Sequence, residues 1–176
     1  MRRVKSTATF IMFKSLCYLF IVSLTFMLSS ASANLQPHAS FSTSLKEASI
    51  DDVIDRAHEL LGTPYKWGGT SADQGFDCSS FLVYLFKTQA NIQLPRTTVA
   101  MHRSTAPTIK RSALKPGDAV FFKGNGRGQV SHVGLYIGEG KFIHSPRTGK
   151  SIRIDSLSNN YWNRNYTTAK RFHSAG

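Results

Sequence analysis

Cys78 is the side chain in this sequence best suited to act as a nucleophile. It begins a helix predicted from DCSSFLVYLFKTQAN, directly after the glycine-rich segment GGTSADQG. A thiol in the first turn of a helix faces the positive end of the helix dipole, which favours the thiolate. The amide groups at that end also point to where an oxyanion would develop. The alternative is an ordinary buried cysteine that packs inward with Phe76 and Phe81.

Two histidines in predicted strands are the candidate partners of this thiol, because a cysteine nucleophile needs a base. His132 begins HVGLYIG and His144 lies in KFIHS, with the turn residues Glu139 and Gly140 between them. Strands joined by a tight turn bring such positions together, so one imidazole could accept the thiol proton while the other orients it. Tyr65, in the loop before the cysteine, could aim its hydroxyl at the same place. The alternative for each is an ordinary polar or half-buried residue.

The elements that must position these side chains change from helical to extended along the chain. Apolar residues recur at helical spacing over residues 50–61, with Ser49 as the expected N-cap and Gly62 as the expected stop. Asp77 is the expected N-cap of the next helix. Strands are predicted at AVFFK, VGLYIG, KFIHS, SIRID and residues 167–172. This order predicts an α+β fold, with N-terminal helices packed on a small, mostly antiparallel β-sheet.

The first 33 residues have the pattern of a secretory signal peptide. Four basic residues precede an apolar run at 16–28, and small residues lead to Ala33. We expect cleavage there and a periplasmic or secreted protein, with an uncleaved membrane anchor as the alternative. Residues 34–48 are polar and predict a flexible N-terminal arm, and residues 49–176 predict one catalytic domain.

Charge and cysteine content exclude several classes of protein. The 176 residues carry a formal charge of +12, which falls to +8 when the signal peptide and its four basic residues are removed. The charge is spread along the chain without a nucleic-acid-binding motif, so we expect no nucleic acid and only a weak association with anionic surfaces.

Removal of Cys17 leaves Cys78 as an unpaired thiol. A zinc site made by Cys78, His132 and His144 is the competing chemistry, but no H-x-x-x-H motif accompanies them.

Five segments in order resemble the NlpC/P60 family of cell-wall cysteine peptidases. They are PYKWGGTSADQGFDCSSF, LPRTT, LKPGDAVFF, SHVGLYIG and KFIHS. The resemblance covers about residues 50–172 and is strongest to the small Gram-negative members. It implies a papain-like fold and hydrolysis of peptide bonds in peptidoglycan stems or cross-links through a thioester. It also implies no metal or organic cofactor, and we expect a monomer that acts on peptidoglycan peptides.

The resemblance also assigns roles by position. It implies that Cys78 is the nucleophile, that His132 is the general base and then the general acid, and that His144 orients His132. It implies that Tyr65 is part of the oxyanion and substrate site. It also implies that Asp77 and Ser79 shape the pocket and contact the amino end of the stem. One departure is Ser80, which stands where the family has glycine after D-C-S. Its side chain could crowd the helix packing or the pocket.

Two other functions stay open on the sequence. Related papain-like cores carry out acyl transfer, because a thioester can be attacked by an amine or a lipid as well as by water. A non-catalytic cell-wall binding module is the second alternative, although such a module has no use for Cys78, His132 and His144 together. The sequence does not distinguish cleavage at the D-Glu to diamino-acid bond from cleavage at the D,D cross-link.

Overall fold

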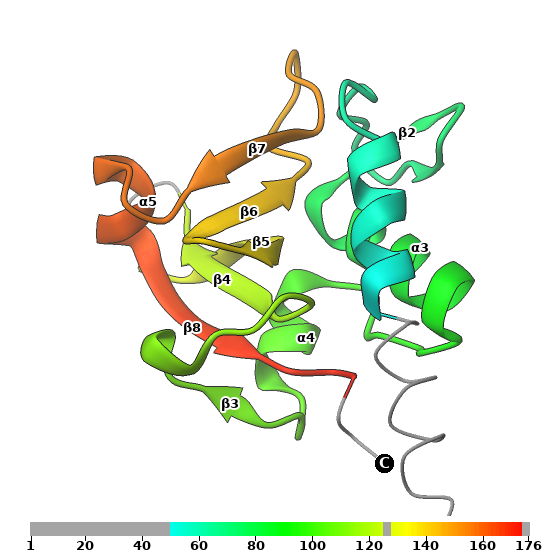
Figure 1. The fold of residues 1–176 in the computed structure, drawn as a ribbon. Coiled ribbons are helices and arrows are strands. Elements are labelled where there is room, and N and C mark those ends of the chain that lie inside the picture. Colours follow the sequence, from blue (N-terminus) through cyan, green and yellow to red (C-terminus); the bar gives the residue numbers. More distant parts are fainter. Residues whose placement is uncertain (1–49, 125–127, 174–176) are drawn as a thin grey trace, which may run out of the picture. The chain divides into compact units, whose positions relative to one another are not determined.

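The computed structural model describes residues 50–124 and 128–173, and its elements follow the predicted order from helices to strands (Figure 1). The predicted signal peptide, the predicted arm, Cys17 and Ser49 lie outside these residues. Among the described residues, none of the helices has both the length and the apolar character needed to cross a membrane. After a helix at residues 50–59, the elements are β1 (Thr70–Ser71), β2 (Gly75–Phe76), α3 (Cys78–Ala90), α4 (Thr98–Arg103), β3 (Thr108–Ile109), a 3-10 helix (Arg111–Ala113), β4 (Ala119–Lys123), β5 (Val130–Gly138), β6 (Lys141–His144), β7 (Arg153–Ser156), α5 (Asn160–Asn165) and β8 (Tyr166–Lys170).

The main sheet is antiparallel and has the strand order β3-β8-β4-β5-β6-β7. Its centre is a meander of consecutive strands, which is the arrangement that short connections favour. Glu139 and Gly140 connect β5 to β6, with φ angles of 51° and 70°. Two successive positive φ angles are typical of the tight hairpin turn that matches strand twist. The predicted hairpin is therefore confirmed.

Side chains of the sheet alternate between two apolar cores. In β4, Ala119 and Phe121 belong to the core that includes α3, whereas Val120 and Phe122 belong to a second core with Trp162 of α5. Strand geometry requires this alternation, because successive side chains point to opposite faces. Both α3 and α4 pack against β5, while α5 contacts β4. In Figure 1, α3 and α5 accordingly lie on opposite sides of the sheet.

The start of α3 is fixed by a reciprocal capping box. The Asp77 carboxylate accepts a hydrogen bond from the Ser80 amide at 2.7 Å, and the Ser80 hydroxyl accepts one from the Asp77 amide at 2.9 Å. Without these bonds the backbone amides of Asp77 and Ser80 would be unpaired donors at the helix end. The prediction that Asp77 caps this helix is confirmed. As a result, Cys78 is the first residue of α3.

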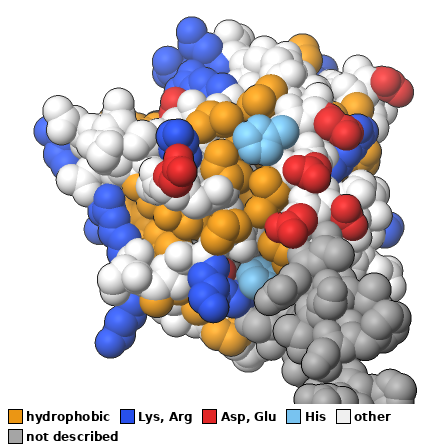
Figure 2. Space-filling model, viewed as in Figure 1, with side chains coloured by type: hydrophobic (Ala, Val, Ile, Leu, Met, Phe, Trp, Pro, Cys, Tyr) orange, Lys and Arg blue, Asp and Glu red, His pale blue; other side chains and the backbone are white. Residues whose placement is uncertain are grey.

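Acidic side chains gather on the helix at residues 50–59. The four exposed ones are Asp51, Asp52, Asp55 and Glu59. Figure 2 shows acidic side chains gathered on one part of this face, with Lys and Arg side chains scattered elsewhere on it. The negative charge of this helix would repel an anionic polymer, so such a polymer would approach other surfaces of the protein more easily.

Candidate active site

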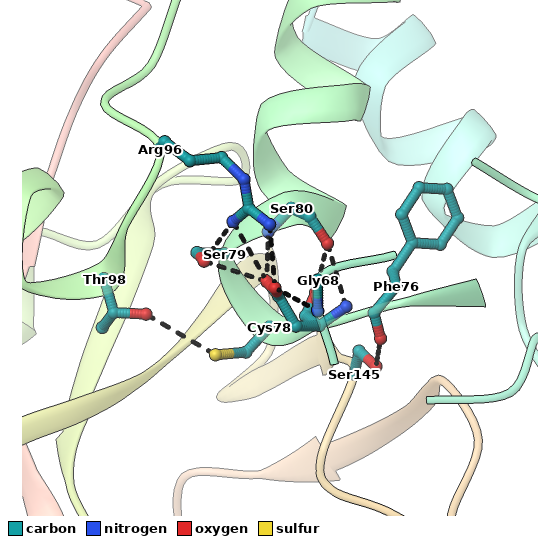
Figure 3. A network of polar contacts seen from close by, with 9 residues as sticks. Gly68, Phe76, Cys78, Ser79, Ser80, Arg96, Thr98 and Ser145 are labelled. Atoms are coloured by element: carbon teal, nitrogen blue, oxygen red, sulfur yellow. Dashed lines mark hydrogen bonds and ion pairs between the residues drawn. The ribbon is translucent and has the colours of Figure 1, made fainter. Parts of the chain in front are cut away.

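The thiol of Cys78 lies between α3, α4 and β5. Its Sγ is 3.5 Å from the hydroxyl of Thr98 on α4. Figure 3 shows the side chain pointing from the start of α3 toward Thr98. Val133 follows His132 in β5, and Cys78 packs against the apolar core that contains Val133. Among the described residues, the hydrogen-bond partners of the sulfur do not include His132 itself.

Burial raises the pKa of the Cys78 thiol, and the negative charge of Asp77 raises it further. The Thr98 hydroxyl and the backbone of Val133 and Ser79 lower the pKa but do not outweigh burial. The thiol is therefore protonated near neutral pH. Burial and the charge of Asp77 thus act against the expectation that the helix start would favour the thiolate.

His132 and His144 form a direct imidazole pair. Nε2 of His132 is 2.8 Å from Nδ1 of His144, so the predicted closeness of these residues across the hairpin is confirmed. Burial lowers the pKa of His132 to about 3, and the neighbouring His144 lowers it further. Burial also lowers the pKa of His144, with Asp155 opposing the shift. Both imidazoles are therefore neutral at pH 7, and a neutral imidazole is the form that can accept a proton.

Asp155 and Trp162 extend this pair, and the sequence interpretation assigned no role to either. Nε2 of His144 is 2.9 Å from Oδ2 of Asp155, which also accepts the indole N–H of Trp162 at 2.8 Å. The Trp162 ring stacks on His132 with ring centroids 5.4 Å apart. Asp155 pairs with Phe142 across β6 and β7, which places it diagonally from His144 on the same face. Its position in the strand that follows KFIHS was the only available signal.

Arg96 joins Asp77 and Ser79 on the other side of the cysteine. Its guanidinium is 3.0 Å from Oδ2 of Asp77 and 3.1 Å from the Ser79 hydroxyl (Figure 3). Burial alone would raise the pKa of Asp77, but the hydrogen bonds from Arg96, Ser80 and Ser79 outweigh it and lower the pKa. The structure thus brings the predicted Asp77 and Ser79 into direct hydrogen-bond contact, with the Asp77 carboxylate ionised. Arg96 belongs to the segment LPRTT, and no pattern in the sequence around it predicted that it would lie beside Asp77 and Ser79.

Ser80 does not crowd the helix. It is 2% exposed, and its hydroxyl both completes the capping box and donates to the Asp77 carbonyl at 3.1 Å. Ser80 also lines a cavity of about 340 Å³ beside Tyr84 and Arg96. The expected disturbance of helix packing is therefore wrong, because the serine side chain replaces a missing backbone partner at the helix start.

Tyr65 lies in the loop that precedes β1. Its amide donates to the carbonyl of Lys150 at 2.8 Å, and the amide of Lys66 donates to that of Phe76 at 3.0 Å. Burial raises the pKa of the Tyr65 phenol, and the charges of Cys78 and Asp77 raise it further. Tyr65 also forms a backbone bridge with Phe76, the residue before Asp77. The structure therefore brings Tyr65 to the site on a loop with fixed backbone contacts.

The arrangement as a whole combines a thiol, neutral imidazoles and an ionised carboxylate. Within residues 50–124 and 128–173, no group of three or more His, Cys, Asp or Glu side chains is arranged to hold a metal ion. A thiol at the start of α3, which packs against the strand that carries His132, and a neutral imidazole are the two groups that nucleophilic attack on carbonyl carbon requires.

Comparison with known proteins places this geometry in a family. The profile of the NlpC/P60 family matches residues 62–171, a range that contains all six predicted site residues. The chain belongs to the NlpC/P60 family. As an NlpC/P60 protein it has the α+β architecture that the sequence predicted, and an NlpC/P60 family protein from Bacillus cereus has a crystal structure of the same fold. That structure has a TM-score of 0.65 and 38% sequence identity, over 70% of this chain and 40% of the other.

Two curated relatives carry informative names. Murein DD-endopeptidase MepH from Escherichia coli is 50% identical over 120 residues, which are 68% of this chain and 44% of that protein. A gamma-D-glutamyl-L-lysine dipeptidyl-peptidase from Bacillus subtilis is 36% identical over 129 residues, which are 73% of this chain and 43% of that protein. The chain thus spans less than half the length of each of these relatives.

Proposed function

We propose that this NlpC/P60 protein is an exported cysteine endopeptidase that hydrolyses peptide bonds in peptidoglycan stem peptides or cross-links. The observation that carries the proposal is that α3, which begins at Cys78, packs against β5, and that His132 of β5 is hydrogen-bonded to His144 at 2.8 Å. The names of MepH and the dipeptidyl-peptidase support peptidoglycan peptides as the substrate. The D,D cross-link is the first bond to test, since MepH has the higher identity.

The reaction starts from a neutral thiol and a neutral imidazole. As Sγ of Cys78 attacks the scissile carbonyl, Nδ1 of His132 takes the thiol proton, and the carbonyl oxygen becomes an oxyanion. The Cys78 amide and the Tyr65 hydroxyl stabilise that charge. His132 then donates the proton to the leaving amine, which breaks the C–N bond and leaves a thioester. Water, deprotonated by His132, hydrolyses the thioester and regenerates the thiol.

Asp77 and Ser79 bind the amino end of the stem peptide in this mechanism. The lowered pKa of Asp77 keeps its carboxylate ionised, which suits an ammonium group. Arg96 holds the carboxylate in place through two hydrogen bonds and offsets part of its charge. Ser79 donates to the same carboxylate at 2.9 Å and so limits its rotation.

Export places the enzyme where its substrate lies. The pattern of residues 1–33 supports a signal peptide, and a residual charge of +8 supports weak association with an anionic wall or membrane surface. The enzyme acts as a monomer. Because Cys78 and His132 supply the nucleophile and the base, the reaction uses neither a metal nor an organic cofactor.

Digestion of defined muropeptides by the purified protein, followed by mass spectrometry, tests the proposal. The expected products are pairs of fragments whose masses sum to the substrate plus one water, with a cut at the D,D cross-link or after D-Glu. Fragments transferred to an added amine or lipid without uptake of water would instead identify an acyltransferase. Binding to sacculi without any product, together with a Cys78 alkylation rate no faster than that of a free peptide thiol, would identify a binding module.

A further inference from the structure

A continuous hydrogen-bonded chain runs from His132 to a carboxylate for which neither the sequence nor the family comparison gives a role. It passes from Nε2 of His132 to Nδ1 of His144 at 2.8 Å, and from Nε2 of His144 to Oδ2 of Asp155 at 2.9 Å. His144 is fully buried, whereas Asp155 is half-buried. Each of the two imidazoles in this series of hydrogen bonds therefore uses a specific ring nitrogen for a specific partner.

Asp155 is held as an acceptor. Burial alone would raise its pKa, but the hydrogen bonds from His144, Arg153 and Trp162 outweigh this effect and lower the pKa well below its usual range. An ionised carboxylate accepts hydrogen bonds and donates none. Three donors, on His144, Arg153 and Trp162, lie within 2.9 Å of the same oxygen, Oδ2. The carboxylate is therefore held in place and offers only an acceptor to His144.

This acceptor determines the tautomers of both histidines. Nε2 of His144 must carry the hydrogen that it donates to Asp155, so Nδ1 of neutral His144 carries a lone pair. That lone pair accepts a hydrogen bond, so Nε2 of His132 must be the donor. Neutral His132 then has its lone pair on Nδ1. Without a fixed acceptor at the far end, the pair could equally take the reverse arrangement, with hydrogen on Nδ1 of His132 and no lone pair there.

We propose that Asp155 is a positioning residue that sets the tautomer of His144 and, through it, leaves Nδ1 of His132 free to accept the Cys78 proton. The proposal rests on the proposed cysteine-peptidase function and deepens it. Trp162 supports the arrangement from two sides, because its indole N–H holds Asp155 and its ring stacks on His132. A wrong tautomer at a catalytic histidine leaves the geometry intact but removes the base.

Nitrogen-15 NMR of the histidine rings tests the tautomers in the unaltered protein at pH 7. We expect His132 and His144 each to carry hydrogen on Nε2 and a lone pair on Nδ1. Hydrogen on Nδ1 of His132 in the unaltered protein would overturn the proposal without any variant. This result does not depend on whether muropeptides are cleaved, so it is separate from the test of the proposed function.

The variant Asp155→Ala removes the acceptor, and Asp155→Glu keeps a carboxylate. For Asp155→Ala we expect signals of the reverse tautomer and a decrease in kcat of about 10- to 100-fold, with a smaller change in KM. Asp155→Glu should restore part of kcat together with the original ring signals. The matched control is Asp55→Ala, which removes an exposed carboxylate from the helix at residues 50–59 and should change neither measurement. Unchanged tautomers and unchanged kcat in folded Asp155→Ala would contradict the proposal.

Discussion

The hydroxyl of Ser145 donates a hydrogen bond of 2.7 Å to the carbonyl oxygen of Phe76, although the two residues are 69 positions apart. Ser145 follows His144 at the end of β6, and Phe76 precedes the N-cap of α3 by one residue. Both residues are fully buried. This hydrogen bond therefore links the strand that carries the histidine pair to the loop that positions the cysteine (Figure 3).

Ser145→Ala should lower the free energy of unfolding by about 1 kcal/mol, because one buried hydrogen bond is lost. The Phe76 carbonyl keeps its second donor, the Lys66 amide, so a larger loss is not expected. Urea unfolding measures the change. The exposed Ser158→Ala is the matched control and should stay within about 0.5 kcal/mol of the parent. Equal stability of the two variants would show that the Ser145 hydrogen bond makes no net contribution.

Thr98→Val should raise the pKa of Cys78. The Thr98 hydroxyl is 3.5 Å from the sulfur, and its hydrogen bond lowers the pKa of the thiol. Valine has a similar shape but cannot donate, so the thiolate loses a stabilising partner. The rate of alkylation by iodoacetamide should therefore rise at a higher pH than in the parent. Thr88→Val, on the exposed face of α3, should leave the profile unchanged. A Thr98→Val profile at the same or lower pH would contradict this role.

Gly134→Ala should destabilise the protein and disturb the histidine pair. A Cβ atom at Gly134 would lie 2.6 Å from Cδ2 of Phe142 and 3.2 Å from Cβ of His144, and both side chains are buried. Overpacking of this kind costs about 1–3 kcal/mol. Displacement of His144 should lower kcat more than it changes KM.

The double variant Gly134→Ala/Phe142→Leu checks the cause of that loss. Leucine removes the ring atom nearest the new methyl group, so the double variant should lose less stability than the sum of the single losses. Thermal unfolding of the four proteins measures this coupling. Strict additivity would place the effect of Gly134→Ala elsewhere, for example in the backbone of β5.

The fold should lose stability as the pH falls from about 6.5 toward 4. The pKa of His132 is lowered from 6.5 to about 3, and that of His144 is also lowered, so the unfolded chain binds protons in this range that the folded chain does not. Stability is full above pH 6.5 and decreases as the pH falls below it. The pKa of three carboxyls is also lowered: those of Asp77, Asp155 and Asp118, the last of which pairs with Arg171 at 2.7 Å. They add to the loss only below about pH 4, because their ordinary pKa is 3.8.

His132→Gln should make the stability less dependent on pH between 6.5 and 4, because one of the two titrating groups is removed. Urea unfolding at several pH values measures the slope. The exposed His58→Gln serves as the control and should keep the slope of the parent. A slope in His132→Gln as steep as that of the parent would mean that His132 takes up its proton equally well in the folded and unfolded chains.

Local sequence patterns predicted the parts of the fold that local physics determines. The capping residue Asp77, the turn at Glu139 and Gly140, and the apolar periodicity of α3 each specify their element within a few residues. The closeness of His132 and His144 followed because one short turn sets the register between β5 and β6.

Contacts that depend on tertiary packing were not predictable in the same way. Asp155 reaches His144 only through the register of β6 with β7, and Trp162 belongs to α5, a six-residue helix without apolar periodicity. The raised pKa of Cys78 also depends on packing against α4 and β5, whereas the helix dipole is visible in the sequence. Such burial is a property of the assembled fold.

Cleavage of purified peptidoglycan by the parent protein and by Cys78→Ala, measured side by side, decides whether the thiol carries the reaction. Cys78 is half-buried, and alanine occupies less volume, so the variant should fold and show the circular dichroism spectrum of the parent. The proposed mechanism predicts that the parent releases peptide fragments and that folded Cys78→Ala releases none above background. Fragment release by Cys78→Ala at the rate of the parent would contradict it.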